Sequence, residues 1–151
     1  MRELRIDPHD LQIRGVTYGA FVDLGRAPTV DEVSAATRHA PADIRASWRR
    51  LHDAHALVLD DVGELRMLNP FSAVPTPYLV RTDGRSWYAN CAWDAFGICA
   101  ALRADGLIET ACADCGEELT IEVRDRRPDR GDLLFHCLLP AAMWWDDIVF
   151  T

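Results

Sequence analysis

Apolar residues in the first third of the chain recur with a helical period. Over residues 11–22 they lie three or four positions apart, as on the buried face of an amphipathic helix. Thr29, with Glu32 three positions later, has the sequence of a capping box, which predicts that a second helix begins there. A third helix is expected from Pro41 onward, with Trp48 on its apolar face.

Two short apolar runs follow the predicted helices and have the pattern of a β-hairpin. They occupy residues 57–59 and 65–68 and flank a turn rich in Asp and Gly. Three helices and a hairpin are the pattern of a winged-helix-like unit. Residues 69–77 then contain three prolines, which argue against a helix or a central strand. We expect an extended connector, docked on the surface through Phe71 and Val74.

The pattern of the second half of the chain predicts strands around one helix. An Asp-Gly turn joins predicted strands at 78–81 and 86–89. Residues 91–103 are apolar on most sides, as in a buried helix, and Asn90 is placed to be its N-cap. Further strands are expected at 107–111, 118–124, 133–139 and from 148 to 151, with a short helical turn at 140–145.

These patterns predict an α+β protein with two regions. Residues 1–77 form the winged-helix-like three-helix unit with its wing and connector, and residues 78–151 form a small, mostly antiparallel sheet with one buried helix. A hydrophobic fraction of 49% and a charged fraction of 26% are ordinary for a folded domain and exclude disorder. No apolar run approaches the roughly 20 residues of a membrane span, and the N-terminus lacks a signal peptide's apolar stretch. We therefore expect a cytoplasmic protein.

The charge of the chain argues against nucleic-acid binding. Sixteen basic residues, all arginine, stand against 24 acidic ones, and the net charge is −8. Residues 1–77 carry a net charge of −2, and the turn of the predicted wing is acidic. The helical unit is therefore expected to pack on the second half, although its third helix carries three arginines. They are Arg45, Arg49 and Arg50.

All five cysteines lie in the second half of the chain. An odd number cannot be fully paired within one chain, and thiols are expected in a reducing cytoplasm. Cys112 and Cys115 form a single Cys-x-x-Cys without a second ligand pair, so no structural zinc site is predicted. This pair has two open interpretations: capture of a soft metal or redox exchange, and a tight turn with two thiols. The other cysteines are Cys91, Cys99 and Cys137.

The candidate chemistry lies in Asn90-Cys91-Ala92-Trp93-Asp94. A thiol at a helix N-terminus is expected to have a lowered pKa, and Asp94, three residues later, shares its helix face. A soft sulfur beside a carboxylate can bind a soft metal and pass a proton. The alternative is a small buried residue beside a carboxylate that only interacts with the helix dipole.

This segment resembles the organomercurial lyase (alkylmercury lyase) family, which has a Cys-Ala-x-Asp core opening a helix. The stretches 69–72 and 112–116 resemble the family as well, and the resemblance covers roughly residues 10–151. It implies a winged-helix-like region not known to bind DNA. It also implies protonolysis of a carbon–mercury bond, which yields a hydrocarbon and thiolate-bound Hg(II).

Carried over to this sequence, the family mechanism makes Cys91 the first mercury ligand and nucleophile and Asp94 the proton carrier. Trp87, Trp93 and Phe96 would line a dry pocket for the organic group. No dissociable cofactor is implied. The small-molecule partner is an organomercurial, and cellular thiols or a mercuric reductase would remove the product.

The family's second catalytic cysteine is expected after a region like 144–150, and Thr151 is the last residue of the sequence. Three explanations stay open: a piece of a longer protein, a substitute thiol at Cys99 or Cys137, and a scaffold without lyase activity. Two alternative functions also stay open. One is a non-catalytic soft-metal-binding or sensor protein that uses Cys91, Cys112 and Cys115. The other is a lyase for another carbon–heteroatom bond.

Overall fold

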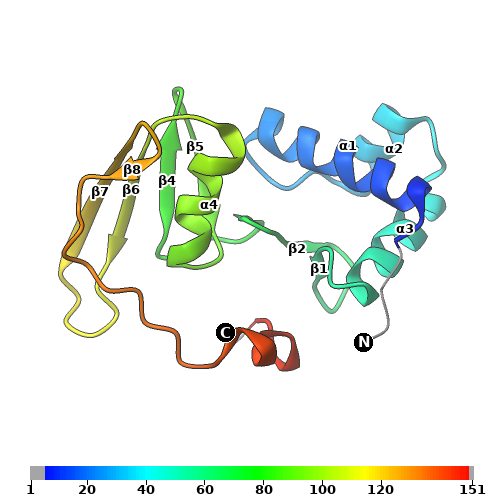
Figure 1. Cartoon of the computed structure of the whole chain (residues 1–151). Helices are drawn as coiled ribbons and strands as arrows, with labels where there is room; N and C mark the ends of the chain where they lie inside the picture. Colours follow the sequence, from blue (N-terminus) through cyan, green and yellow to red (C-terminus); the bar gives the residue numbers. More distant parts are fainter. Residues whose placement is uncertain (1–5, 150–151) are drawn as a thin grey trace.

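The computed structural model describes residues 6–149, and its first half contains the three expected helices (Figure 1). They are α1 (Pro8–Leu24), α2 (Val30–Thr37) and α3 (Pro41–Asp53). Helix α1 begins earlier than the apolar pattern indicates because Pro8 occupies its first turn and the Asp7 side chain caps it. In the described part of the chain, no helix combines the length and apolar character that a bilayer crossing requires.

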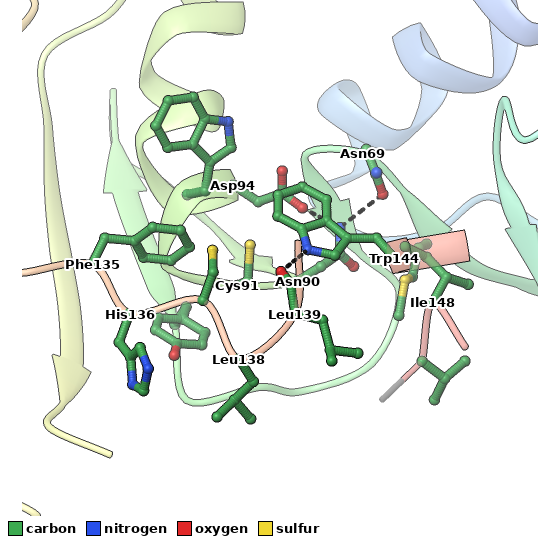
Figure 2. Close-up of a pocket in the computed structure, with 15 residues that line it drawn as sticks. Asn69, Asn90, Cys91, Asp94, Phe135, His136, Leu138, Leu139, Trp144 and Ile148 are labelled. Atoms are coloured by element: carbon green, nitrogen blue, oxygen red, sulfur yellow. Dashed lines mark hydrogen bonds between the residues drawn. The ribbon is translucent and has the colours of Figure 1, made fainter. Parts of the chain in front are cut away.

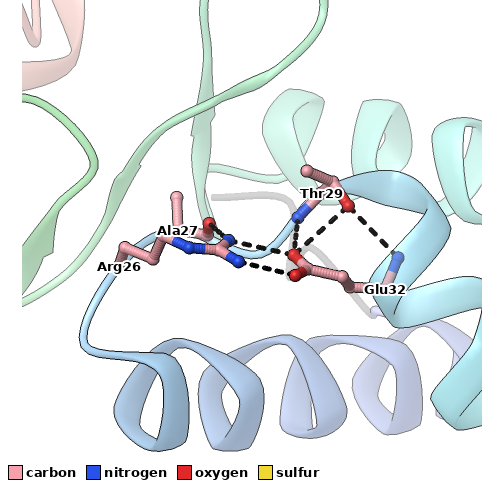
Figure 3. A network of polar contacts seen from close by, with 4 residues as sticks. All are labelled: Arg26, Ala27, Thr29 and Glu32. Carbon is pink, nitrogen blue, oxygen red and sulfur yellow. Dashed lines mark hydrogen bonds and ion pairs between the residues drawn. The ribbon is translucent and has the colours of Figure 1, made fainter.

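The predicted capping box of α2 is confirmed and carries an added ion pair (Figure 3). The backbone N–H of Glu32 donates to Thr29 Oγ1 at 3.2 Å, and the backbone N–H of Thr29 donates to Glu32 Oε2 at 2.7 Å. Arg26 Nη2 lies 2.6 Å from Glu32 Oε1. The Arg26 guanidinium and, next, the Thr29 amide lower the pKa of Glu32 to about 2. The start of α2 is thus fixed by local contacts alone.

The strands of both halves belong to one eight-stranded sheet whose order is β1-β2-β3-β5-β4-β6-β7-β8. Every pairing within it is antiparallel, as the mostly antiparallel prediction requires. The strands are β1 (Val58–Leu59), β2 (Leu65–Leu68), β3 (Phe71–Ser72), β4 (Leu79–Thr82), β5 (Arg85–Ala89), β6 (Gly106–Ala111), β7 (Glu118–Arg124) and β8 (Arg127–Pro128).

The connector departs from the prediction because it contributes a strand inside the sheet. β3 pairs with β2 on one side and with β5 on the other. The prolines at 70 and 75 flank this two-residue strand and remove no ladder donor from it. Phe71 is buried as expected, whereas Val74 is exposed. The β1–β2 hairpin and the second half are therefore hydrogen-bonded through the connector.

One hydrophobic core runs through the molecule. It joins Trp48 of α3 and Phe21 of α1 to Phe71 of the connector, and continues to Ile98 and Ile108 in the second half. Helix α4 (Ala92–Leu102) packs on β4, β5 and β6 (Figure 1). The helical unit thus packs on the second half, as the charge of the chain suggested.

The C-terminal segment differs from its predicted strands. Residues 133–139 form an extended segment that pairs with no strand, although β8 covers only the last two residues of β7. The expected helical turn is present as a 3-10 helix at Ala141–Asp146. Ile148 and Val149, expected to begin a last strand, lie in a turn, and the rest of that prediction falls on 150–151, outside the described residues.

A buried carboxylate joins α1 to α3. Asp10 is 2% exposed and accepts hydrogen bonds from Ser47 Oγ at 2.7 Å and from Arg50 Nε and Nη2 at 2.8 and 2.7 Å. On α3, Arg45 pairs with Glu64 of the β1–β2 hairpin at 3.0 Å. Two of the three arginines that a recognition helix would offer to DNA are thus paired within the chain.

Asp10→Asn is expected to destabilise the fold by about 1–3 kcal/mol, because an amide cannot accept at both positions and leaves either the buried Ser47 hydroxyl or the Arg50 guanidinium without its acceptor. The Arg50 hydrogen bond lowers the pKa of Asp10 in the folded state. The stabilisation is therefore present above the carboxyl's ordinary pKa and is lost as the pH falls through the lowered one. Urea unfolding at several pH values measures both effects. Asp53→Asn, at an exposed carboxylate, is the control and should change neither.

Candidate active site

A pocket opens where the start of α4 meets the C-terminal segment (Figure 2). One wall comes from the residues around the β5–α4 junction, and the other comes from the extended segment and the 3-10 helix. The pocket therefore combines parts of the chain that are far apart in sequence. Its lining is Met67, Asn69, Tyr78, Asn90, Cys91, Trp93, Asp94, Phe135, His136, Cys137, Leu138, Leu139, Trp144, Ile148 and Val149.

Cys91 is the N-cap residue of α4, a place that the sequence assigned to Asn90. Its backbone is extended, with φ −151° and ψ 179°, so the helix begins one residue later than expected. Burial raises the pKa of the half-buried Cys91 thiol, and the backbone amides of Asp94 and Trp93 only partly oppose this. The expected lowering of this pKa is thus wrong, because desolvation outweighs the helix N-terminus. Cys91 rests as a neutral thiol with a proton to give.

Asp94 lines the same pocket one helical turn further on. Burial raises the pKa of its carboxyl group, and a hydrogen bond from the Asn90 side chain opposes that rise. A carboxyl group of this kind holds a proton at a higher pH than a solvated aspartate does. The carboxylate also raises the pKa of Cys91, so the charges of the two groups interact. The structure therefore brings together the two residues that the sequence pairs.

Asn90 holds the carboxyl group of Asp94 in place. Its Nδ2 lies 2.9 Å from Asp94 Oδ2, 3.2 Å from Asn69 Oδ1 and 3.3 Å from the carbonyl oxygen of Phe71 (Figure 2). The amide has two hydrogens for three acceptors. Tyr18 of α1 donates to the carbonyl oxygen of Asn69. Hydrogen bonds through Asn69 of the connector and the Asn90 side chain therefore link the helical unit to the carboxyl group of Asp94.

Asn90→Ala is expected to raise the pKa of Asp94 further, because the amide hydrogen bond that favours the carboxylate is lost. The side-chain carboxyl ¹³C shift of Asp94, followed against pH, measures the change. Asn69→Ala is the matched control: it removes a competing acceptor and leaves the Asn90–Asp94 bond in place. A higher pKa in the control, or an unchanged one in Asn90→Ala, would contradict this role for Asn90.

The two cysteines considered as a second thiol lie in different environments. Cys137 lines the pocket, is exposed, and is close enough to Cys91 that its charge raises the Cys91 pKa. Cys99 is 3% exposed and faces the core. Its Sγ would lie 2.8 Å from a β-carbon at position 106, where the chain has glycine. Of these two, Cys137 is the one that shares the pocket with Cys91.

Only one of the three aromatic residues expected in the pocket lines it. Trp93 is 65% exposed at the pocket, and its ring centroid lies 6.2 Å from that of Phe135. Trp87 is buried in the core on β5, because strand alternation turns it to the face that packs against Phe71. Phe96 packs against the core from the body of α4. These two expectations are corrected by the structure.

Cys112 and Cys115 lie in the turn between β6 and β7 and line no part of the pocket. Within residues 6–149, no group of three or more His, Cys, Asp or Glu side chains is arranged to hold a metal ion. The three-cysteine ligand set of the sensor alternative is therefore not assembled in the described structure.

Several lining residues are outside the sequence-based candidate set, with Asn69, Tyr78 and Trp144 among them. Burial and the charge of Cys91 raise the pKa of Tyr78, so its hydroxyl remains a neutral donor beside the thiol. No spacing rule connects these positions with Cys91. The resemblance of 69–72 to the family was the one available signal for Asn69.

Comparisons with known proteins show the family and the fold of the chain. The family model described as alkylmercury lyase (MerB) matches residues 71–151, more than half of the chain. A search of curated proteins gives no match. The fold is similar to the crystal structure of the mercury-bound form of MerB2, with a TM-score of 0.68 and 21% sequence identity. The alignment covers 83% of this chain and 61% of that one, so the chain spans less than two thirds of its length. The chain belongs to the alkylmercury lyase family.

Proposed function

We propose that this protein cleaves the carbon–mercury bond of organomercurials by protonolysis. The observation that carries the proposal is the shared pocket of the Cys91 thiol, the Asp94 carboxyl group and the Cys137 thiol. Thiolates are the protein ligands that soft metals prefer, and a buried carboxyl group can hold and deliver a proton. Membership of the alkylmercury lyase family indicates which class of reaction these groups would carry out.

The reaction balances without an oxidant or reductant. The Cys91 sulfur bonds to the mercury of R–Hg–X, and its thiol proton moves to the carboxylate of Asp94. The Cys137 sulfur bonds to the same mercury, and its proton leaves with X as HX. The carbon then takes the electron pair of the carbon–mercury bond and the proton from Asp94. The products are R–H and Hg(II) bound by two thiolates.

The raised pKa values of Cys91 and Asp94 suit this sequence of steps. A neutral thiol brings its own proton into the pocket, and the carboxyl group that receives this proton holds it more firmly than a solvated aspartate does. Two sulfur ligands donate charge to mercury, which makes the bound carbon more basic. The proton is therefore delivered where negative charge develops.

The pocket walls suit a small apolar organic group. Phe135, Leu138 and Leu139 of the extended segment line the pocket, together with Ile148 and Val149. Such apolar walls favour an alkyl or aryl group over a charged one. The substrate class is therefore small organomercurials.

Because Cys137 is exposed, thiols from solution can reach the mercury ion that it binds in the product. Thiols exchange on mercury by attack of an incoming thiolate, so an exposed sulfur is the first to be replaced. Cellular thiols or a mercuric reductase would complete the removal, in a cytoplasm that keeps the five free cysteines reduced.

Release of benzene from phenylmercury acetate tests the proposal. The purified chain, with an excess of a monothiol, is expected to release benzene continuously, measured by gas chromatography against a blank that contains the thiol alone. Mercury should accumulate as the thiol complex in equal amount. Benzene at the level of the blank would show that the chain lacks this activity.

A further inference from the structure

The β6–β7 turn carries two thiols that the proposed reaction does not use. Cys112 and Cys115 are held in a tight turn, in which the N–H of Gly116 donates to the carbonyl oxygen of Cys112 at 2.9 Å. The N–H of Cys112 donates to the carbonyl oxygen of Glu117 at 2.8 Å and closes the hairpin. Cys112 is half-buried and Cys115 is exposed. The backbone thus holds both cysteines in one tight turn.

The two thiols interact with each other. Hydrogen bonds from the backbone amides of Cys115 and Asp114, and then from the Cys115 thiol, lower the pKa of Cys112. A lowered pKa means a larger thiolate fraction, and thiolate is the form that binds metals and attacks in exchange. Cys112 therefore differs from Cys91, whose pKa burial raises.

Sheet register places this turn at the same end of the sheet as the active site. Tyr88 of β5 pairs with Leu79 of β4, which pairs with Glu109 of β6. Cys91 lies three residues after Tyr88, and Cys112 lies three residues after Glu109. Since β5 and β6 are separated by β4 alone, the two strands lie about 10 Å apart. Figure 1 shows the β6–β7 turn and the start of α4 at this shared end.

We propose that Cys112 and Cys115 form a second Hg(II) site, in which the two sulfurs bind one ion while it passes from the pocket to solution. Each sulfur replaces one thiolate on mercury, and each displaced thiolate takes up the thiol proton, so that no electron is transferred. Two linked sulfurs hold the ion more tightly than two separate monothiols because the second bond forms within one molecule. The site rests on the proposed function only for the source of its ion.

Binding is tested in the Cys91→Ser/Cys137→Ser protein, which has no thiol pair in the pocket. Hg(II) is supplied as its glutathione complex with excess glutathione, and the protein is desalted and analysed by native mass spectrometry. One retained ion per chain is expected. Adding Cys112→Ser or Cys115→Ser should weaken retention on the order of 10²-fold or more, the usual gain from linking two sites. Adding Cys99→Ala should leave it unchanged.

Alkylation of the same protein by iodoacetamide provides a second measurement that does not depend on the Cys112 and Cys115 variants folding. Bound Hg(II) should protect Cys112 and Cys115 together. Absence of a retained ion, or labelling of both residues at the rate of the metal-free protein, would overturn the second site. Neither result would bear on carbon–mercury cleavage, because this protein lacks the pocket thiols.

Discussion

Cys91→Ser and Cys137→Ser are each expected to abolish benzene release from phenylmercury, whereas Cys99→Ala retains it. Both pocket sulfurs bond to mercury in the proposed reaction, and a serine hydroxyl is a hard ligand that does not replace a thiolate on a soft metal. Cys99 faces the core, and alanine there removes a thiol without adding a buried polar group. Gas chromatography under identical thiol concentrations compares the three variants.

The comparison of Cys137 with Cys99 decides which thiol is the second ligand. Circular dichroism should show that all three variants keep the fold, since Cys137 is exposed and Cys91 caps α4 without a side-chain bond to the helix. Full activity in Cys137→Ser would mean that a different group completes the mercury coordination. Loss of activity in a folded Cys99→Ala protein would remove the distinction between the core thiol and the pocket thiol.

Asp94→Asn is expected to slow carbon–mercury cleavage by roughly 10²–10⁴-fold, the range in which a positioned acid or base contributes. The amide keeps the size of the side chain but cannot carry the proton from Cys91 to carbon. The two sulfurs remain, so binding of the organomercurial should persist. Single-turnover release of benzene from a preformed protein–phenylmercury complex separates the two effects.

The pH dependence of the single-turnover rate is an independent test of whether Asp94 carries the proton. The fraction of Asp94 that carries a proton falls as the pH rises through its raised pKa, so the wild-type rate should fall in the same direction. Asp94→Asn should lose this dependence, because asparagine does not titrate in this range. A variant that is as fast as the wild type, or equally sensitive to pH, would assign the proton to another group.

Local sequence signals predicted the helices because the interactions that fix them are local. Thr29 and Glu32 are three residues apart and bond to each other, so the start of α2 can be read from the sequence. The strand at Phe71 and Ser72 depends on β2 and β5, which lie outside the connector. Residues 133–139 have the composition of a strand, but residues 135–139 line the pocket instead of pairing in the sheet.

The same distinction applies to the candidate site. Cys91 and Asp94 share a helix turn, and their spacing placed them together. Cys137 comes from the extended segment, and only the folded chain shows that it lies beside Cys91 while Cys99 does not. The direction of the Cys91 pKa shift could not be predicted from the sequence either, because it depends on how deeply distant residues bury the thiol.

The position of β3 inside the sheet limits where the gene can recombine without disrupting the sheet. A gene segment that began at residue 78 would encode a sheet whose β5 edge lacks its partner and a site without Asn69. Recombination between relatives would therefore preserve the candidate site only when the crossover keeps the connector with the second half. The β1–β2 hairpin and α1, which contact the connector through β2 and Tyr18, should then evolve in step with it, although they contribute no reacting atom in the proposed reaction.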